Sequence, residues 1–213
     1  MKITPEQIEI CEKYDWAVHT EDGDVWIEVQ DACSILVGDI ISFELTDGEA
    51  VEAMAVKKDD QNTIFCLVDC LRDEYKMNSR NTNKGGYEAS ELRAKLNVEI
   101  LARFPTEITE MMVPFANGDL LRLPTEKEIF GVNSYGLDEP EDVTQWKPMK
   151  LRRNRIAFQG LNGSWEWYWL QNPALRDVAS STHFALVTGN GHAAANSASD
   201  SIGVRPAFQI RNL

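Results

Sequence analysis

The chain has 213 residues, of which 43% are apolar, and this composition is typical of one large domain with a hydrophobic core. Its formal net charge of −13 argues against nucleic acid and anionic membranes as partners, because both repel an acidic surface. No stretch approaches the roughly 20 apolar residues of a membrane helix, and residues 1–6 lack the apolar run of a secretion signal, which predicts synthesis in the cytoplasm.

Charge and cysteine are both unevenly distributed. Residues 160–213 hold three acids and three bases, so the whole net charge resides in residues 1–159. The four cysteines, Cys11, Cys33, Cys66 and Cys70, all lie in the first third of the chain. Without a secretion signal, free thiols are expected. Cys66 alternates with apolar residues, so we predict buried structural thiols at Cys66 and Cys70 rather than metal ligands.

The first segment has the pattern of a small helix followed by a hairpin. Residues 4–7 provide an N-cap, a proline at the first helical position and a capping-box Gln. Residues 16–18 and 25–27 are strand-like and flank Asp22-Gly23, a turn signal. We predict that residues 1–37 form an appendage and that residues 38–213 form the main domain.

The main domain begins with strands and continues with two helices. Residues 40–45 and 51–56 flank Asp47-Gly48 as a second hairpin, residues 63–68 form a third strand, and residues 78–86 form a polar loop. Residues 89–104 are the clearest helix, because Leu92, Leu96 and Ile100 repeat at helical spacing before Pro105. A second, short helix starts at a capping box of Thr125 and Glu128 and is closed by Gly131.

The remaining chain is predicted to return to short strands. Residues 133–150 are a polar connection, and strand-like pieces follow at residues 155–159, 165–170, 183–187 and 203–210. This order of strands, two helices and strands predicts an α+β fold with small antiparallel sheets.

Several pieces of the chain resemble a known family. Residues 121–128 (LRLPTEKE) resemble the "RLPTE-x-E" signature of formylglycine-generating-enzyme-like domains, a branch of the C-type-lectin-like fold. Residues 202–208 (IGVRPAF) resemble the strand that closes such domains. Residues 87–97 (YEASELRAKLN), Gly38-Asp39 and residues 167–173 (WYWLQNP) resemble DUF6273, a bacterial and phage family. The likeness covers about residues 37–210, and its specificity comes from the order of the pieces.

The resemblance implies a C-type-lectin-like scaffold and a set of structural residues. These residues are Arg122, Thr125, Glu126, Glu128 and Arg205. An arginine in a Gly-x-Arg-Pro strand can satisfy a carboxylate with its donors, so we expect Arg205 to form a buried pair with Glu126 or Glu128. The alternative is an exposed edge position for Arg205.

Enzymatic activity is not predicted. The related oxidases need a cysteine pair near the C-terminus, and this chain has no cysteine after Cys70. Its three histidines, His19, His183 and His192, fit no metal-ligand spacing. We therefore predict no catalytic residue, no metal ligand and no cofactor. A calcium ion at the acidic residues 22–24 or 138–142 stays an open alternative to solvated loops there.

Residues 179–201 are the predicted binding face. Of these 23 residues, 19 are Ala, Ser, Thr, Asn, Gly or His. Such small polar residues give adaptable hydrogen bonds, and neighbouring aromatic residues give rigid contact area, although an ordinary surface loop is the competing interpretation. We expect Trp167 and Trp169 on one face of their strand. The predicted ligand-binding residues are Trp167, Tyr168, Asn172, Arg176, Ser181, His183, Phe184, Asn190, His192, Asn196 and Ser199.

C-type-lectin-like domains also include the variable proteins of diversity-generating retroelements, in which such a segment is mutagenised. By resemblance, the variable positions would be Asn172, Ala174, Arg176, Ser181, His183, Asn190, His192, Asn196 and Ser199. The leading hypothesis is a binding protein encoded by a phage or prophage, which recognises a protein or carbohydrate on a cell surface. An enzyme of unknown reaction and a structural virion component, including a homo-oligomer, are the alternatives.

Overall fold

The computed structural model describes residues 17–21, 24–28, 35–137, 139–175, 177 and 179–212. The chain divides into two units, Met1–Ile35 and Leu36–Leu213. In the first unit, β1 (Ala17–Glu21) pairs antiparallel with β2 (Asp24–Glu28), which confirms the predicted hairpin. The predicted helix that starts at residues 4–7, the turn Asp22-Gly23, Cys11 and Cys33 lie outside the described residues.

The larger unit is built on a four-stranded antiparallel sheet in the order β13-β5-β4-β3. Its strands are β3 (Ile40–Glu44), β4 (Ala50–Lys58), β5 (Asn62–Leu67) and β13 (Ala207–Arg211). The three N-terminal strands and the second hairpin confirm the sequence prediction. The last strand begins later than predicted, at Ala207, because Pro206 has no backbone donor and Arg205 points into the core.

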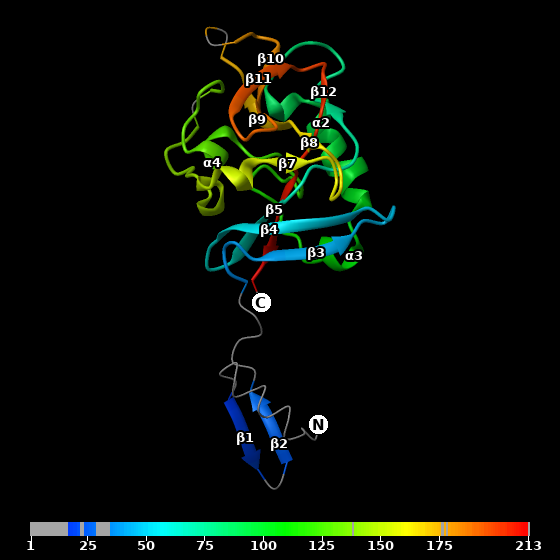
Figure 1. Cartoon of the computed structure of the whole chain (residues 1–213), viewed down its shortest axis with the longest axis vertical. Helices are drawn as coiled ribbons and strands as arrows, with labels where there is room; N and C mark the ends of the chain where they lie inside the picture. Colours follow the sequence, from blue (N-terminus) through cyan, green and yellow to red (C-terminus); the bar gives the residue numbers. More distant parts are fainter. Residues whose placement is uncertain are drawn as a thin grey trace. The chain divides into compact units, whose positions relative to one another are not determined.

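Three smaller sheets complete this unit. The sheet β11-β10-β9 contains β9 (Tyr168–Pro173), β10 (His183–Val187) and β11 (Ala193–Ser197), and it lies at the opposite end of the unit from β3 and β4 (Figure 1). The other two sheets have two strands each. In one, β6 (Tyr75–Lys76) pairs with β12 (Ser201–Ile202), and in the other, β7 (Ala157–Phe158) pairs with β8 (Trp165–Glu166). The fold is therefore α+β with small antiparallel sheets.

The predicted long helix is present as an irregular helical segment that contains α2 (Glu91–Lys95), the π-turn η2 (Leu96–Ile100) and η3 (Leu101–Arg103). The 3₁₀ turn η1 (Tyr87–Ala89) precedes it and is separated from it by Ser90, whose backbone is extended. Ser90 caps α2 by accepting a hydrogen bond from the Arg93 N–H at 3.2 Å. The Asn97 amide donates to the carbonyl of Arg93, and this side-chain bond accompanies the widened turn. The predicted apolar stripe of Leu92, Leu96 and Ile100 is fully buried.

The other helices are short. The capping box of Thr125 and Glu128 opens α4 (Glu126–Phe130), and Gly131 closes it with a left-handed φ of 81°, as predicted. The sequence did not predict α3 (Thr106–Thr109). It also missed the 3₁₀ turns η4 (Lys147–Lys150) and η5 (Arg152–Arg155), which lie in and beyond the segment expected to be a polar connection.

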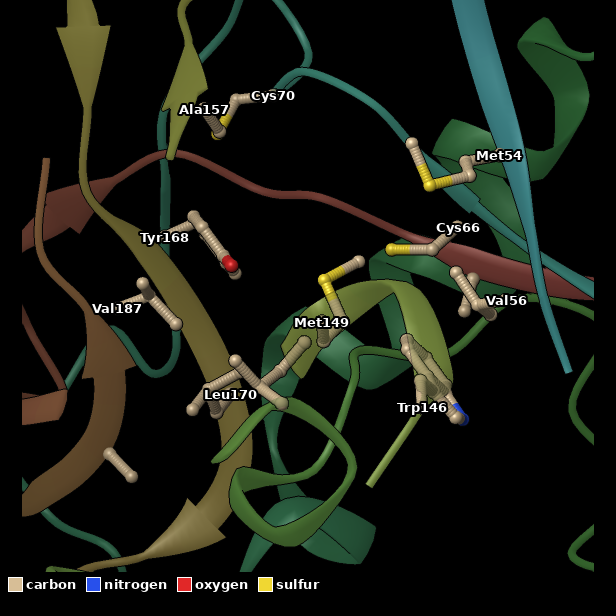
Figure 2. Close-up of a cluster of buried hydrophobic side chains, with 13 residues drawn as sticks. Met54, Val56, Cys66, Cys70, Trp146, Met149, Ala157, Tyr168, Leu170 and Val187 are labelled. Atoms are coloured by element: carbon tan, nitrogen blue, oxygen red, sulfur yellow. The ribbon is translucent and has the colours of Figure 1, made fainter. Parts of the chain in front are cut away.

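Both faces of the main sheet are buried. On one face, the rings of Phe65 and Phe208 stack at 5.6 Å, and Phe43 and Phe104 pack around them. On the other face, alternating residues of β4, β5 and β13 join a second cluster that reaches α4, η4 and the β9–β10 sheet. Figure 2 shows this cluster, which contains Met54, Val56, Cys66, Cys70, Ile129, Trp146, Met149, Ala157, Tyr168, Leu170, Ala185, Val187 and Ala207.

Arg205 holds this second cluster together, but not through the predicted carboxylate. Its side chain is 1% exposed and donates to the Leu67 carbonyl at 2.5 Å, the Asn154 carbonyl at 3.0 Å and the Tyr168 hydroxyl at 3.1 Å. The expected pair with Glu126 or Glu128 is therefore wrong, and the alternative of an exposed edge is wrong as well. Arg205 instead connects β5, η5 and β9.

The two glutamates have other partners that occupy their oxygens. Glu128 forms a bidentate ion pair with Arg122 at 2.6 and 2.7 Å. Glu126 accepts backbone N–H bonds from Ser134, Tyr135 and Gly136 and so shapes the loop after α4. The two glutamates and Arg205 therefore stabilise different parts of the unit.

Replacing Arg205 with Met should lower the free energy of unfolding by about 2–5 kcal/mol, because buried acceptors in three elements lose their donor. Chemical denaturation would measure this loss. Arg211→Met, at the exposed end of β13, is the matched control and should change the unfolding free energy by less than about 0.5 kcal/mol. Equal stability of the two variants would contradict the proposed role of Arg205.

Candidate functional site

Two exposed tryptophans line a groove on the larger unit. Trp165 is 61% exposed and Trp167 is 37% exposed, which is unusual for the largest apolar side chain. The groove has a volume of about 450 Å³ and is also lined by Thr188, Gly189 and Asn190. We call this the tryptophan groove. Its volume falls within the roughly 300–1,000 Å³ range of small-ligand sites.

The tryptophan side of the groove is fixed by backbone pairing. Trp165 lies in β8 directly opposite Phe158 of β7, whose ring is also exposed. The Gly203 N–H donates to the Trp167 carbonyl at 3.0 Å, and the Trp169 N–H donates to the Gly203 carbonyl at 3.1 Å. A Cβ at Gly203 would lie 2.7 Å from the Trp167 carbonyl oxygen, so only glycine allows this close approach.

The other side is the tight turn between β10 and β11. The Thr188 N–H donates to the His192 carbonyl at 2.8 Å. The Thr188 hydroxyl donates to the Asn190 side-chain oxygen at 2.6 Å. The Asn190 Nδ2 group makes no hydrogen bond within the part of the chain that the structure describes. This amide therefore has two donors available to a ligand.

Gly189 determines where the Trp165 ring lies. A Cβ at this glycine would come within 2.0 Å of Trp165 Cε3 and 2.7 Å of Cζ3. The indole ring thus packs directly on the backbone of the β10–β11 turn, with no side chain between them. This contact orients a flat aromatic surface along the groove although the ring is largely exposed.

The side chains that line the groove combine apolar faces with hydrogen-bonding groups. Its lining side chains are indoles, a hydroxyl and an amide, and none of them titrates near neutral pH. Glu166 lies between the two tryptophans in the sequence. Its pKa is raised by burial and by the neighbouring Glu74 carboxylate. Indole faces provide apolar contact, and the amide and hydroxyl provide directional hydrogen bonds.

The predicted ligand-binding residues do not form one surface. Trp167 and Asn190 line the tryptophan groove, and His192 is exposed at the end of the same turn. Ser181 lines a second groove of about 460 Å³ with Asn83, Gly85, Gly86, Leu137, Pro173, Ala174 and Leu175. His183, Asn196 and Ser199 are half-buried, and Arg176 lies outside the described residues.

Three of the predicted ligand contacts are wrong because they are core residues. Tyr168 and Phe184 are fully buried, and the Tyr168 hydroxyl donates to the Arg155 carbonyl. Asn172 is also buried: its side-chain oxygen accepts the Glu126 N–H and its amide donates to Glu139. Trp169 is buried as well, whereas Trp167 is exposed, so the expected common face for these two tryptophans is not observed.

The predicted binding face at residues 179–201 is only partly at the surface. Residues Phe184–Val187 of β10 and Ala198 are fully buried, because β10 is the central strand of its sheet. The strands that flank this segment in the sequence, β9 and β13, belong to different sheets. An isolated bridge between Tyr168 and Gly203 connects β9 to the segment that precedes β13. The exposed part is the β10–β11 turn.

A basic segment beside the groove was missed in the sequence. Residues 143–165 hold five bases and no acid, although the chain as a whole carries a net charge of −13. The five bases are Lys147, Lys150, Arg152, Arg153 and Arg155. None of them forms an ion pair with any residue in the described ranges. The net charge had been counted over residues 1–159 as a whole, and that sum does not show a short stretch of five bases.

The two cysteines that the structure describes are both shielded from solvent. Cys66 and Cys70 are buried and unpaired in disulfides, as predicted. Burial raises the pKa of Cys66 to about 11 and that of Cys70 well above its ordinary value, so both stay protonated at neutral pH. Across the described residues, no group of three or more His, Cys, Asp or Glu side chains is arranged to hold a metal ion. The acidic residues proposed for calcium include Asp22 and Asp138, which lie outside those ranges.

Comparisons with protein-family models, with curated proteins and with solved structures found no match. Among the described residues, no helix is both long enough and apolar enough to span a membrane. The function must therefore be argued from the geometry of the site.

Gly189→Ala should displace the Trp165 ring, because the added Cβ would overlap it. The indole N–H resonance of Trp165 should shift in a proton–nitrogen NMR spectrum, whereas those of buried Trp146 and Trp169 should not. In a Trp165→Ala background, the same glycine substitution should have no further effect on the spectrum around the groove. An unchanged Trp165 resonance would contradict the contact.

Cys66 and Cys70 should resist alkylation by iodoacetamide at pH 8 in the folded protein, because burial keeps both thiols protonated and inaccessible. In urea, both should react. Peptide-resolved mass spectrometry would measure each site separately. Rapid labelling of either residue without denaturant would show that this part of the core opens readily.

Proposed function

We propose that this chain is a ligand-binding protein and that the tryptophan groove is its contact surface. The observation that carries the proposal is the exposure of Trp165 and Trp167 beside an amide and a hydroxyl on a rigid turn. Exposed tryptophans held in one orientation lose little side-chain entropy on binding, and they dominate the energetics of many binding sites. The ligand would be a carbohydrate or protein on a cell surface.

We further propose that the scaffold is C-type-lectin-like. The residues that carry the resemblance have structural roles in the fold, and this supports the proposal. The signature at residues 121–128 contains the capping box and the Arg122–Glu128 ion pair. The closing segment contains Gly203, which packs against Trp167, and Arg205, which bonds to three elements.

The groove supports a binder over an enzyme. An enzyme on this scaffold would be favoured by a perturbed acid or histidine at the bottom of a deep apolar pocket. The lining residues of the tryptophan groove include neither, and its two indole rings are open to solvent. Nothing in the described residues specifically favours the structural virion component.

Origin in a phage or prophage and variation by a retroelement are parts of the proposal that concern the gene. The variation would have to be restricted, because Asn172 and Ala174 are buried and exchange there would disturb the core. Asn190, His192 and Ser181 are exposed and could be exchanged at low cost. A nearby near-copy of the coding segment that differs only at adenines would support this proposal, and its absence would oppose it.

Trp165→Ala combined with Trp167→Ala should abolish binding while the melting temperature changes little, since both rings are exposed. Labelled protein would be applied to an array of bacterial surface glycans and to intact bacterial cells. We expect an affinity loss of about tenfold or more wherever the wild type binds. Val98→Ala, at another exposed apolar residue, is the control and should bind like the wild type. Full binding by the double variant would exclude the groove as the contact surface.

A further inference from the structure

The basic segment, residues 147–155, is rigidly held at the surface. The buried Arg205 guanidinium donates to the Asn154 carbonyl at 3.0 Å, and the Tyr168 hydroxyl donates to the Arg155 carbonyl at 3.0 Å. The Asn154 amide closes the segment on itself by donating to the Pro148 carbonyl at 2.9 Å. Two core residues thus fix the backbone from which the basic side chains project, and preorganised charge binds a ligand more strongly than mobile charge does.

The basic segment adjoins the tryptophan groove. A Cβ at Gly191 would lie 3.2 Å from Arg152 Cγ and 3.1 Å from the Arg152 carbonyl oxygen. Gly191 belongs to the same tight turn as Thr188 and Asn190, which line the groove. Arg152 and the Trp165 ring therefore both approach this turn, at Gly191 and at Gly189.

The charge of this region is unsatisfied within the protein. Lys147, Lys150, Arg152 and Arg153 are exposed, and none forms an ion pair with the residues that the structure describes. Elsewhere, Arg93, Arg103 and Arg122 all pair with carboxylates. Other exposed bases, such as Lys57 and Lys95, are also unpaired among the described residues, but only here do five bases fall within 23 residues that contain no acid. Such a cluster gives a positive surface that complements an anion.

The groove itself fits a sugar ring. One face of a pyranose presents C–H groups, which can be buried against an indole face, and its rim presents hydroxyls. The free Nδ2 donors of Asn190 can bond to such hydroxyls, whereas the Thr188 hydroxyl is engaged with Asn190 and His192 and can at most accept one further bond. A folded protein partner would need a far larger contact, of roughly 1,000 Å² or more, than these five lining residues provide.

We infer that the ligand of the tryptophan groove is an acidic polysaccharide, whose ring stacks on Trp165 or Trp167 while its anionic groups contact the basic segment at Arg152 and Arg153. This inference rests on the proposed function and narrows its ligand class. The anionic group is a carboxylate, sulfate or phosphate ester. Arginine guanidinium binds all three through paired N–H donors.

Single-stranded nucleic acid, like an acidic polysaccharide, has rings that can stack and anionic groups, but it fits the groove and the basic segment less well. It carries a phosphate at every nucleotide, and its backbone would also meet the carboxylates of Glu166 and Glu74 near the tryptophans. The net charge of −13 adds long-range repulsion. A polysaccharide can place an uncharged ring over the groove and its charges over the basic segment only.

The test compares polymers that share a backbone type and differ in charge. The pairs are polygalacturonate with its methyl ester, dextran sulfate with dextran, and carboxymethylcellulose with hydroxyethylcellulose, with oligothymidylate as the nucleic-acid arm. Binding of the full chain is measured by calorimetry and by affinity electrophoresis. We expect the charged member of at least one pair to bind about tenfold or more tightly than its neutral partner at low salt. The difference should shrink as ionic strength rises from about 0.05 M to about 0.5 M.

Three variants separate the possible failures. Arg152→Glu with Arg153→Glu should remove the preference for the charged polymer and leave binding of the neutral one within about twofold. Lys57→Glu with Lys95→Glu makes the same change in net charge at other exposed positions and should keep the preference. Trp165→Ala with Trp167→Ala should abolish binding of both polymers.

Each contrary result has a definite meaning. Equal affinity for charged and neutral polymers, or equal effects of the two charge reversals, would overturn the inference that the ligand is acidic. Neither result would contradict the tryptophan groove as the contact surface. Tighter binding of oligothymidylate than of every polysaccharide would also overturn it, in favour of nucleic acid. No binding of any polymer by the wild type would overturn the polysaccharide ligand, whereas full binding by the tryptophan variant would overturn the proposed function of the groove itself.

Discussion

The fold depends on one buried guanidinium. Arg205 is desolvated, and a charge in that position is tolerated only if its donors are satisfied. The Leu67 carbonyl accepts from Nε, the Asn154 carbonyl and the Tyr168 hydroxyl accept from Nη1, and these groups belong to β5, η5 and β9. Arg205 thereby links elements that lie in different sheets. Together with the Tyr168 hydroxyl it also holds the backbone of the basic segment, so core and surface are coupled there.

Local signals predicted the local structure well. The capping box of Thr125 and Glu128 and the Asp47-Gly48 hairpin depend on neighbours in sequence, and both form as expected. The buried stripe of residues 92–100 was also correct, but the π-turn within it involves Asn97 bonding to distant Leu121. Sequence periodicity does not contain such a tertiary contact, so the irregularity could not be predicted.

The site was harder to predict because burial is a tertiary property. Tyr168, Phe184 and Asn172 have side chains suited to ligand contact, yet each is enclosed by elements far away in sequence. The tryptophan groove combines β8, from one hairpin, with the turn of another. Residues 179–201, singled out by composition, contribute one side of this groove through their exposed Thr-Gly-Asn-Gly turn. A charge count over a short window would have revealed the basic segment.

The contact between Gly189 and Trp165 has a consequence for engineering. The absence of a side chain at position 189 determines the tilt of the Trp165 ring, since any larger group there would lie within 3 Å of it. Gly189 therefore acts through the side chain that it lacks, because its small size lets the ring lie against the turn. Substitutions at 189 would change the orientation of the Trp165 ring, which exchanges at Asn190 or His192 leave in place.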